Sequence, residues 1–162
     1  MRREEGFTLL ELSIVLLVVG LLLQVVLQGG NVVEEARIKR LAMDVEAVGA
    51  AARVYVERYH ALPGDDPLAG RRWPESRSGD GDGTLGEGER AGFWEHLRRA
   101  GLFIRRGGGL EIGFGVLGLP GLALCFTDAT PEAGRLYDLE FDDGEAGSGR
   151  VRSGGGMVCA SL

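Results

Sequence analysis

A glycine-rich acidic stretch, residues 78–89, has the side-chain types and the spacing that metal chemistry needs. Asp80 and Asp82 are separated by a single glycine, and Glu89 closes the stretch. Carboxylate oxygens are the ligands that Ca²⁺ prefers, whereas Mg²⁺ demands a tight octahedron and keeps its water. Glycines allow the sharp backbone turns that a ligand loop requires. The sequence therefore predicts calcium as a cofactor of this loop.

The spacing resembles the calcium loop of EF-hands. In that pattern, Asp80 and Asp82 take the third and fifth positions, Gly83 the sharp turn, Thr84 a backbone carbonyl ligand and Glu89 the bidentate closing position. Ser78 stands where such a loop has its first aspartate, so we expect Asp65 or Asp66 to supply the missing ligand. The alternative is an acidic surface turn that binds no metal.

Catalytic motifs are not evident in the sequence. His60 and His96 are the only histidines, and neither lies in a metal-spaced cluster. Ser148 is flanked by glycines but lacks the strand–turn–helix setting of a nucleophile elbow. Asp142 and Asp143 are adjacent on a predicted turn, where neighbouring carboxylates rarely share a site. We therefore expect the protein not to be an enzyme.

The chain has two cysteines, Cys125 and Cys159, and both follow its longest apolar run. An even number of cysteines in an exported domain predicts a disulfide. Two buried free thiols are the alternative.

The apolar run itself covers residues 7–28 and contains one charged residue, Glu11. A helix rises about 1.5 Å per residue, so this run is long enough to cross a hydrocarbon core about 30 Å thick. A charge inside the membrane costs roughly 2.5–3.5 kcal/mol on insertion scales. The sequence therefore predicts a transmembrane helix and marks Glu11 as a functional residue.

The residues Gly6-Phe7-Thr8-Leu9-Leu10-Glu11, after a short charged leader, resemble the N-terminus of type IV prepilins and pseudopilins. This resemblance implies that residues 1–6 are a leader, that a prepilin peptidase cuts after Gly6, and that the new terminal residue, Phe7, is N-methylated. Glu11 would then pair with the Phe7 amine in the same or an adjacent subunit during assembly. A signal peptide fits less well, because the leader mixes charges and no small-x-small cleavage site follows.

The resemblance also implies a function and a location. We expect a structural subunit of a type IV pilus or a type II secretion pseudopilus, acting in adhesion, motility, DNA uptake or secretion, with other pilin or pseudopilin subunits as partners. It would be a single-pass inner-membrane protein with a periplasmic outer domain before assembly, and later part of a pilus at the cell surface. The alternative is a membrane-tethered calcium- or DNA-binding module that never polymerises.

DNA binding has little support from charge, because the net charge is −6 and phosphate attraction supplies most non-specific affinity. Two arginine groups, 71, 72 and 77, and 98, 99, 105 and 106, are the only candidates for such a contact. A solvated face balanced by nearby acids is the alternative.

The rest of the chain predicts an α+β fold like that of type IV pilins. Residues 29–62 continue the long helix as an amphipathic half, with a hinge or soft spot at Gly29-Gly30, and Pro63-Gly64 ends it. Residues 63–109 form a connector with the acidic loop and a helix over 89–102. Residues 110–162 form a small antiparallel sheet, with predicted strands over 110–116, 122–126, 136–141 and 157–160.

Overall fold

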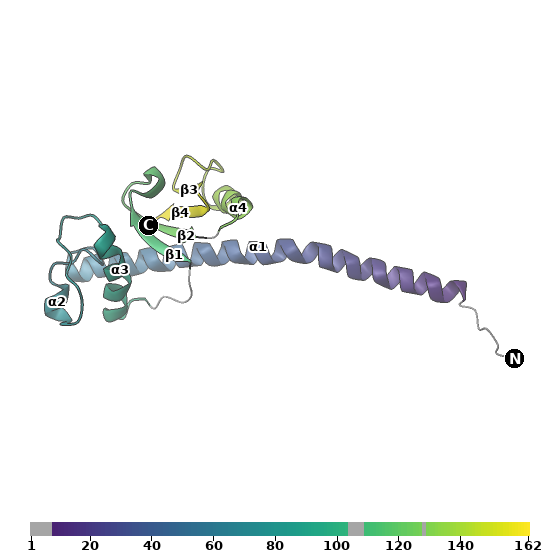
Figure 1. Ribbon diagram of the computed structural model, residues 1–162, viewed down its shortest axis with the longest axis horizontal. Coiled ribbons are helices and arrows are strands. Elements are labelled where there is room, and N and C mark those ends of the chain that lie inside the picture. The colour runs from purple at the N-terminus through teal and green to yellow at the C-terminus, as the bar shows by residue number, and fades with distance from the viewer. Residues whose placement is uncertain (1–7, 104–108, 128) are drawn as a thin grey trace. The chain divides into compact units, whose positions relative to one another are not determined.

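The computed structural model describes residues 8–103, 109–127 and 129–162, and the side chains of residues 25–34 lie outside this description. It divides into two compact units, Met1–Arg37 and Ile38–Leu162, each of which is considered by itself. Its elements in chain order are α1 (Leu9–Tyr59), α2 (Ala69–Arg72), α3 (Glu87–Arg99), β1 (Leu110–Phe114), the 3-10 turn η1 (Val116–Gly118), β2 (Leu122–Thr127), α4 (Pro131–Phe141), β3 (Val151–Gly154) and β4 (Met157–Ser161) (Figure 1). The predicted α+β class, a long N-terminal helix with a small antiparallel sheet, is confirmed.

The backbone of α1 is helical without a break from Leu9 to Tyr59. It continues through Gly29 and Gly30, as expected for one long helix, and the hinge or soft spot at these glycines stays a prediction. Each glycine costs a helix roughly 1 kcal/mol relative to alanine. Two glycines are not enough to interrupt a helix of 51 residues.

Across the residues that the structure describes, no helix combines the length and the apolar character needed to cross a membrane. Phe7 and the side chains of residues 25–28 lie outside those residues. The transmembrane segment over residues 7–28 stays a prediction.

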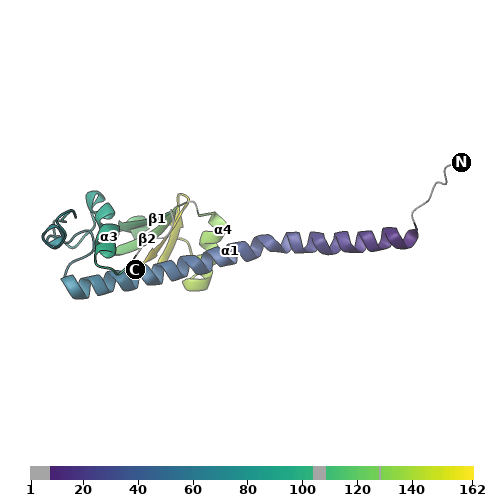
Figure 2. The ribbon, with the colours of Figure 1, turned by 90° about the horizontal axis from the view of Figure 1, so that it is seen from below.

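The second unit is built around the part of α1 that begins at Ile38. Its strands form one antiparallel sheet in the order β1-β2-β4-β3, which lies along this part of α1 (Figure 2). One sheet face meets α1 and α3 in the main core: Val48, Ala51, Ala52, Tyr55, Leu85, Phe93, Leu97, Leu110, Ile112, Leu124 and Phe126. The predicted packing of the amphipathic half on the sheet is thus confirmed for the part of α1 that begins at Ile38.

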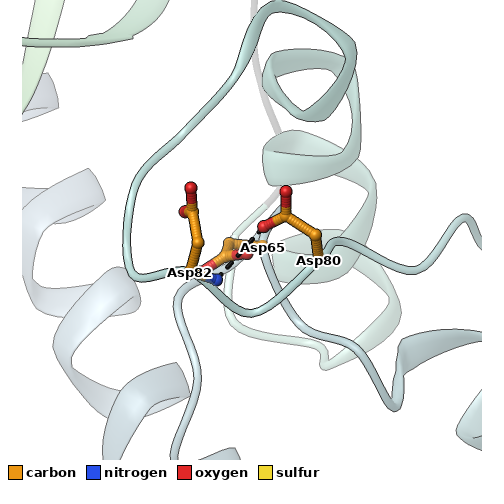
Figure 3. Close-up of side chains that lie close together, drawn as sticks. All are labelled: Asp65, Asp80 and Asp82. Carbon is orange, nitrogen blue, oxygen red and sulfur yellow. Dashed lines mark hydrogen bonds between the residues drawn. The ribbon is translucent and has the colours of Figure 1, made fainter.

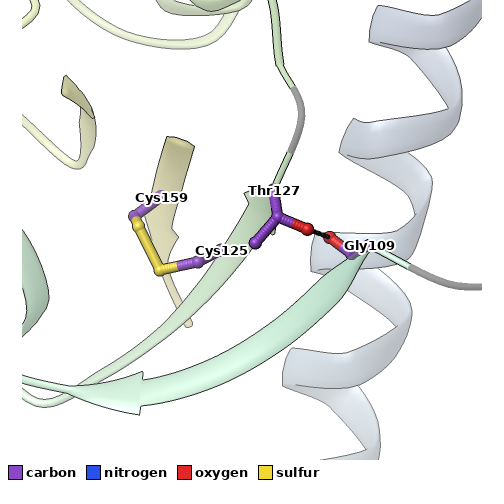
Figure 4. Close-up of a disulfide and its surroundings, with 4 residues drawn as sticks. All are labelled: Gly109, Cys125, Thr127 and Cys159. Atoms are coloured by element: carbon purple, nitrogen blue, oxygen red, sulfur yellow. Dashed lines mark hydrogen bonds between the residues drawn. A yellow bond between two sulfur atoms is a disulfide. The ribbon is translucent and has the colours of Figure 1, made fainter. Parts of the chain in front are cut away.

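A smaller cluster lies on the opposite sheet face. Alternate residues of a strand point to opposite faces, and Ala123 and Cys125 accordingly leave the main core and pack with Leu119 and Cys159. Cys125 is directly opposite Cys159 in the pairing of β2 with β4, and the two form a disulfide (Figure 4). At the end of β2, the Thr127 N–H donates to the Gly109 carbonyl at 2.9 Å, which holds the start of β1 against it.

The strand predicted over residues 136–141 is wrong, because these residues form the second half of α4. Helix-start signals explain the difference. The Thr130 hydroxyl accepts a hydrogen bond from the Ala133 N–H at 3.1 Å, and Pro131 takes the first helical position. The apolar residues Ala133 and Tyr137 are then four apart on the buried side of a helix.

The fourth strand of the sheet is instead β3, which lies within Arg-Val-Arg-Ser-Gly and was not predicted. Only its first residue, Val151, is buried, so the segment lacks the apolar alternation of a half-buried strand. Smaller differences occur at element ends: α3 begins at Glu87 rather than residue 89 and ends at Arg99, and β1 ends at Phe114 before a 3-10 turn. The connector also contains the short helix α2.

Candidate functional site

Glu11 lies in the first turn of α1 and forms a reciprocal cap with Thr8. The Thr8 N–H and hydroxyl donate to Glu11 Oε2 at 3.1 and 3.0 Å, and the Glu11 N–H donates to Thr8 Oγ1 at 3.2 Å. This is the capping-box arrangement, which satisfies backbone donors at a helix start. Gly6 and Phe7 lie outside the described residues, so the predicted cleavage site and the pairing of Glu11 with the Phe7 amine stay predictions.

The large apolar residues between Leu12 and Leu23 are all exposed. Their exposed fractions run from 44% at Val19 to 67% at Leu16. The large ones are Leu12, Ile14, Val15, Leu16, Leu17, Val18, Val19, Leu21, Leu22 and Leu23. Contiguous apolar surface of this extent marks a protein or membrane contact.

The acidic loop brings three carboxylates together: Asp65, Asp80 and Asp82 each place an oxygen within 4.8 Å of the other two. Figure 3 shows Asp65, from the turn after α1, between the two aspartates of the glycine-rich loop. Asp65 is buried, whereas Asp80 and Asp82 are solvent-accessible. Asp65, Gly81 and Gly83 also line a surface hollow of about 580 Å³, so this side of the loop is open to solvent.

Asp65 holds the loop through backbone hydrogen bonds. Its two carboxylate oxygens accept from the N–H groups of Gly81 and Gly83 at 2.5 and 2.8 Å. Both glycines have positive φ, +77° and +84°, which other residues adopt at a cost. Asp82 accepts from the Thr84 N–H and hydroxyl at 2.7 and 2.8 Å, and these bonds lower the Asp82 pKa.

The other predicted ligands lie outside this group of three. Both Glu89 oxygens accept from backbone, Oε1 from Asp80 N–H at 3.0 Å and Oε2 from Gly86 N–H at 2.8 Å. Glu89 therefore closes the loop and caps α3. Asp66 faces the core instead, where it accepts from the Tyr55 hydroxyl at 2.7 Å and pairs with Arg72.

In a second group of carboxylates, Asp138, Asp142 and Asp143, each residue places an oxygen within 4.8 Å of the other two. The sequence indicated only that Asp142 and Asp143 are neighbours on a turn, so this group was not predicted. Each one accepts a backbone hydrogen bond: from Gly144 N–H, Val151 N–H and Glu145 N–H, respectively. Burial raises the pKa of Asp138, and its acidic neighbours raise it further. These hydrogen bonds close the loop between α4 and β3.

The arginines proposed for DNA contact are partly neutralised. Arg72 pairs with Asp66 and lies over the Tyr59 ring at 4.5 Å. Arg99 pairs with Glu75 at 3.1 Å and with Glu95 at 3.6 Å. Arg105 and Arg106 lie outside the described residues. These contacts favour the interpretation of a balanced surface.

Comparison with known proteins identifies the N-terminal segment. Residues 1–23 match the family model of the prokaryotic N-terminal methylation motif. This motif is the signature of type IV prepilins and pseudopilins, so the predicted resemblance is confirmed and the chain carries a pilin-type N-terminus. In general, the motif implies processing by a prepilin peptidase and assembly with other pilin subunits. No curated protein matches the chain, and no solved structure matches it.

Proposed function

We propose that this protein is a non-enzymatic structural subunit of a type IV pilus or a type II secretion pseudopilus. The methylation motif over residues 1–23 is the observation that carries the proposal. Before assembly, the subunit is anchored in the inner membrane with its second unit in the periplasm. It joins the filament after the leader is removed.

The exposed apolar side chains of residues 9–23 support this assembly. Each large one keeps at least 44% of its surface exposed, so lipid covers them first and neighbouring subunits cover them in the filament. Glu11 contributes when neighbouring subunits replace lipid around the helix. Its carboxylate needs a charged partner, which a terminal amine provides and an apolar neighbour does not. The capping bonds from Thr8 leave lone pairs on that carboxylate for the amine.

Fractionation of cells that carry Glu11→Val tests the proposal. The variant should insert into membranes normally but be depleted from sheared filaments, or from cross-linked oligomers of the envelope in the case of a pseudopilus. Ser13→Ala is the matched control, because the Ser13 hydroxyl only donates to the Leu10 carbonyl of its own helix. Normal assembly of Glu11→Val would show that the charge is dispensable. An unsubstituted chain that never leaves the membrane as an oligomer would favour the non-polymerising calcium- or DNA-binding tether.

We further propose that the acidic loop binds one calcium ion. The convergence of Asp65, Asp80 and Asp82 favours this. A carboxylate offers about four lone-pair sites, so oxygens that already accept a backbone N–H still have capacity for a cation. Of the residues predicted from spacing, Asp80 and Asp82 fit as ligands and Asp65 fits in place of Ser78. Thr84 remains a candidate through its carbonyl, whereas Glu89 serves the loop closure.

Thermal unfolding of the full-length chain in detergent tests the calcium proposal. A ligand that binds only the folded state stabilises it by mass action, so the melting temperature should be higher in millimolar calcium than in chelator. Asp82→Asn should remove that difference, because the amide keeps an acceptor for Thr84 but loses the charge. Asp143→Asn, in the second carboxylate group, should retain it. An unsubstituted chain that melts at one temperature in both conditions contradicts the proposal.

A further inference from the structure

His96 is fully buried in the second unit, and both of its ring nitrogens bind backbone groups. The Gly64 N–H donates to Nδ1 at 2.8 Å, and Nε2 lies 2.8 Å from the Arg77 carbonyl oxygen. A backbone N–H only donates and a carbonyl only accepts. These two partners therefore fix the neutral tautomer, with a bare Nδ1 and a proton on Nε2 that is donated to Arg77.

The two hydrogen bonds join three separate segments of the chain. His96 belongs to α3, Gly64 to the turn that follows α1, and Arg77 to the segment that leads into the acidic loop. Neither Gly64 nor Arg77 belongs to a helix or strand. The ring thus supplies partners to backbone groups that no regular element satisfies.

The surrounding packing leaves little room for this arrangement to adjust. Gly64 has a φ of +94°, and a Cβ there would lie 2.6 Å from Leu85 Cδ1 and 2.7 Å from the Glu89 carbonyl oxygen. A Cβ on Gly79 would collide with the backbone of Asp65. The turn, the loop and α3 are therefore in direct contact around the ring.

We propose that His96 is a pH-sensitive clamp that holds residues 63–83, the first part of the connector, against α3 in its neutral form and releases them when protonated. Protonation places an N–H on Nδ1, where it faces the donating N–H of Gly64. Two donors cannot bond to each other, so the Gly64 hydrogen bond is lost. The Arg77 hydrogen bond survives protonation, because Nε2 remains a donor. The turn after α1 is thus the first part of the connector to open.

The groups around His96 decide the direction of the effect. Burial is the largest influence and lowers its pKa; the Arg77 carbonyl from the connector and Glu95 from α3 act in the opposite direction, and Arg72 from α2 adds to the lowering. From α1, the Tyr55 ring stacks at 6.0 Å, and its hydroxyl is committed to Asp66. Trp73 approaches at 6.4 Å and carries no charge.

The sign of the pH dependence follows. An unfolded histidine titrates near pH 6.5, and the folded chain binds this proton less readily. The contribution of the clamp to stability is therefore complete above about pH 6.5. It is lost progressively as the pH falls below that value toward the lower folded pKa.

NMR of the full-length chain in detergent, with isotope-labelled histidine and a chelator present, tests the clamp directly. His60 and His96 are the only histidines, so His60→Gln identifies the His96 signals. At pH 7.5, His96 should show the Nε2–H tautomer, and it should titrate below about pH 6.5, the value of a free histidine. A His96 ring in the other tautomer, or one that titrates at or above that pH, overturns the proposal.

Amide hydrogen exchange provides the second readout. After correction for intrinsic rates, protection of the Gly64 amide should fall roughly five- to tenfold between pH 7.5 and a pH at which the NMR signals show the His96 ring protonated, as expected for loss of one hydrogen bond. The Cys125 amide in β2 should not change, and His96→Gln, which cannot gain a proton, should abolish the pH dependence at Gly64. Unchanged Gly64 protection while the ring becomes protonated overturns the clamp, even if His96→Gln does not fold.

Discussion

The two parts of α1 differ in where their apolar side chains lie. In the first unit, large apolar residues between Leu9 and Leu23 are exposed, and Leu16 keeps 67% of its surface. In the second unit, Ile38, Val48 and Tyr55 of the same helix are at most 2% exposed. One continuous helix therefore contains a segment that needs a partner outside its chain and a segment that its own chain already covers.

This contrast indicates that the exposed segment serves assembly, whereas the second unit folds on its own contacts. The second unit has its own core, a four-stranded sheet and a disulfide. A change in the exposed segment should therefore alter membrane insertion or filament assembly and leave the second unit folded. A change in the core should destabilise the second unit and leave membrane insertion unaltered. Both tryptophans, Trp73 and Trp94, lie in the second unit, so their fluorescence reports its unfolding selectively.

The disulfide gives the largest expected effect on the second unit. Replacing Cys125 and Cys159 together by serine opens a loop with a sequence separation of 34, and the chain-entropy model assigns such a loop roughly 4 kcal/mol of unfolding free energy. Denaturant unfolding followed by tryptophan fluorescence measures the loss. Thiol labelling of the denatured, non-reduced chain should find no free cysteine. Two free thiols in protein recovered from the cell surface would contradict the bond.

A pair of leucine substitutions tests the difference between the exposed segment and the core directly. Leu124→Ala removes a fully buried side chain from the main core and should lower the unfolding free energy by about 2–5 kcal/mol. Leu16→Ala removes an exposed one and should change it by less than about 0.5 kcal/mol. Equal losses in the same denaturant experiment would show that the two segments are not independent.

The buried hydrogen bond between Tyr55 and Asp66 has a smaller expected effect. Tyr55→Phe removes a donor from a carboxylate that is 1% exposed, and a hydrogen bond to a charged group contributes about 1.5–3 kcal/mol. Arg72 and the Leu68 N–H still bind Asp66, so we expect the lower end of this range. Tyr59→Phe is the matched control, because its ring packs 4.5 Å from that of Tyr55 but is only partly buried. An unchanged denaturation midpoint for Tyr55→Phe would contradict this assignment.

The smallest expected effect concerns Asp138. Its raised pKa means that the folded state favours the protonated form, so its favourable contribution exists at low pH and is lost as the pH rises through the folded pKa. Asp138→Asn keeps an acceptor for Gly144 N–H and removes the charge. The variant should match the unsubstituted chain near pH 4 and be more stable by less than about 1 kcal/mol at pH 7.5. A variant that is less stable at pH 7.5 would contradict this sign.

Local patterns in the sequence predicted the regions whose structure depends on local signals. The 3–4 residue spacing of apolar residues predicted the amphipathic part of α1, and apolar runs predicted β1, β2 and β4. The motif around Glu11 was recognisable because its residues are contiguous. The pairing of Cys125 with Cys159 required only that the chain contains two cysteines.

Other features depend on contacts between distant segments. The Leu136–Phe141 segment has an imperfect alternation that fits a strand, and only the Thr130 cap with Pro131 distinguishes it as a helix. β3 is polar and is identified by its pairing with β4. The choice of Asp65 over Asp66 beside the acidic loop, and the placing of Gly64 and Arg77 on either side of His96, follow from how residues 63–83 fold back on α3.

The mass of the mature protein tests the central claim, that this chain is processed as a pilin-type subunit, most directly. Intact mass spectrometry of the chain purified from its native membranes should give a polypeptide that begins at Phe7 and carries one added methyl group. Gly6→Ala should leave the unprocessed chain in the membrane. A mature chain that begins at Met1, or one cut after Leu27, would contradict the account.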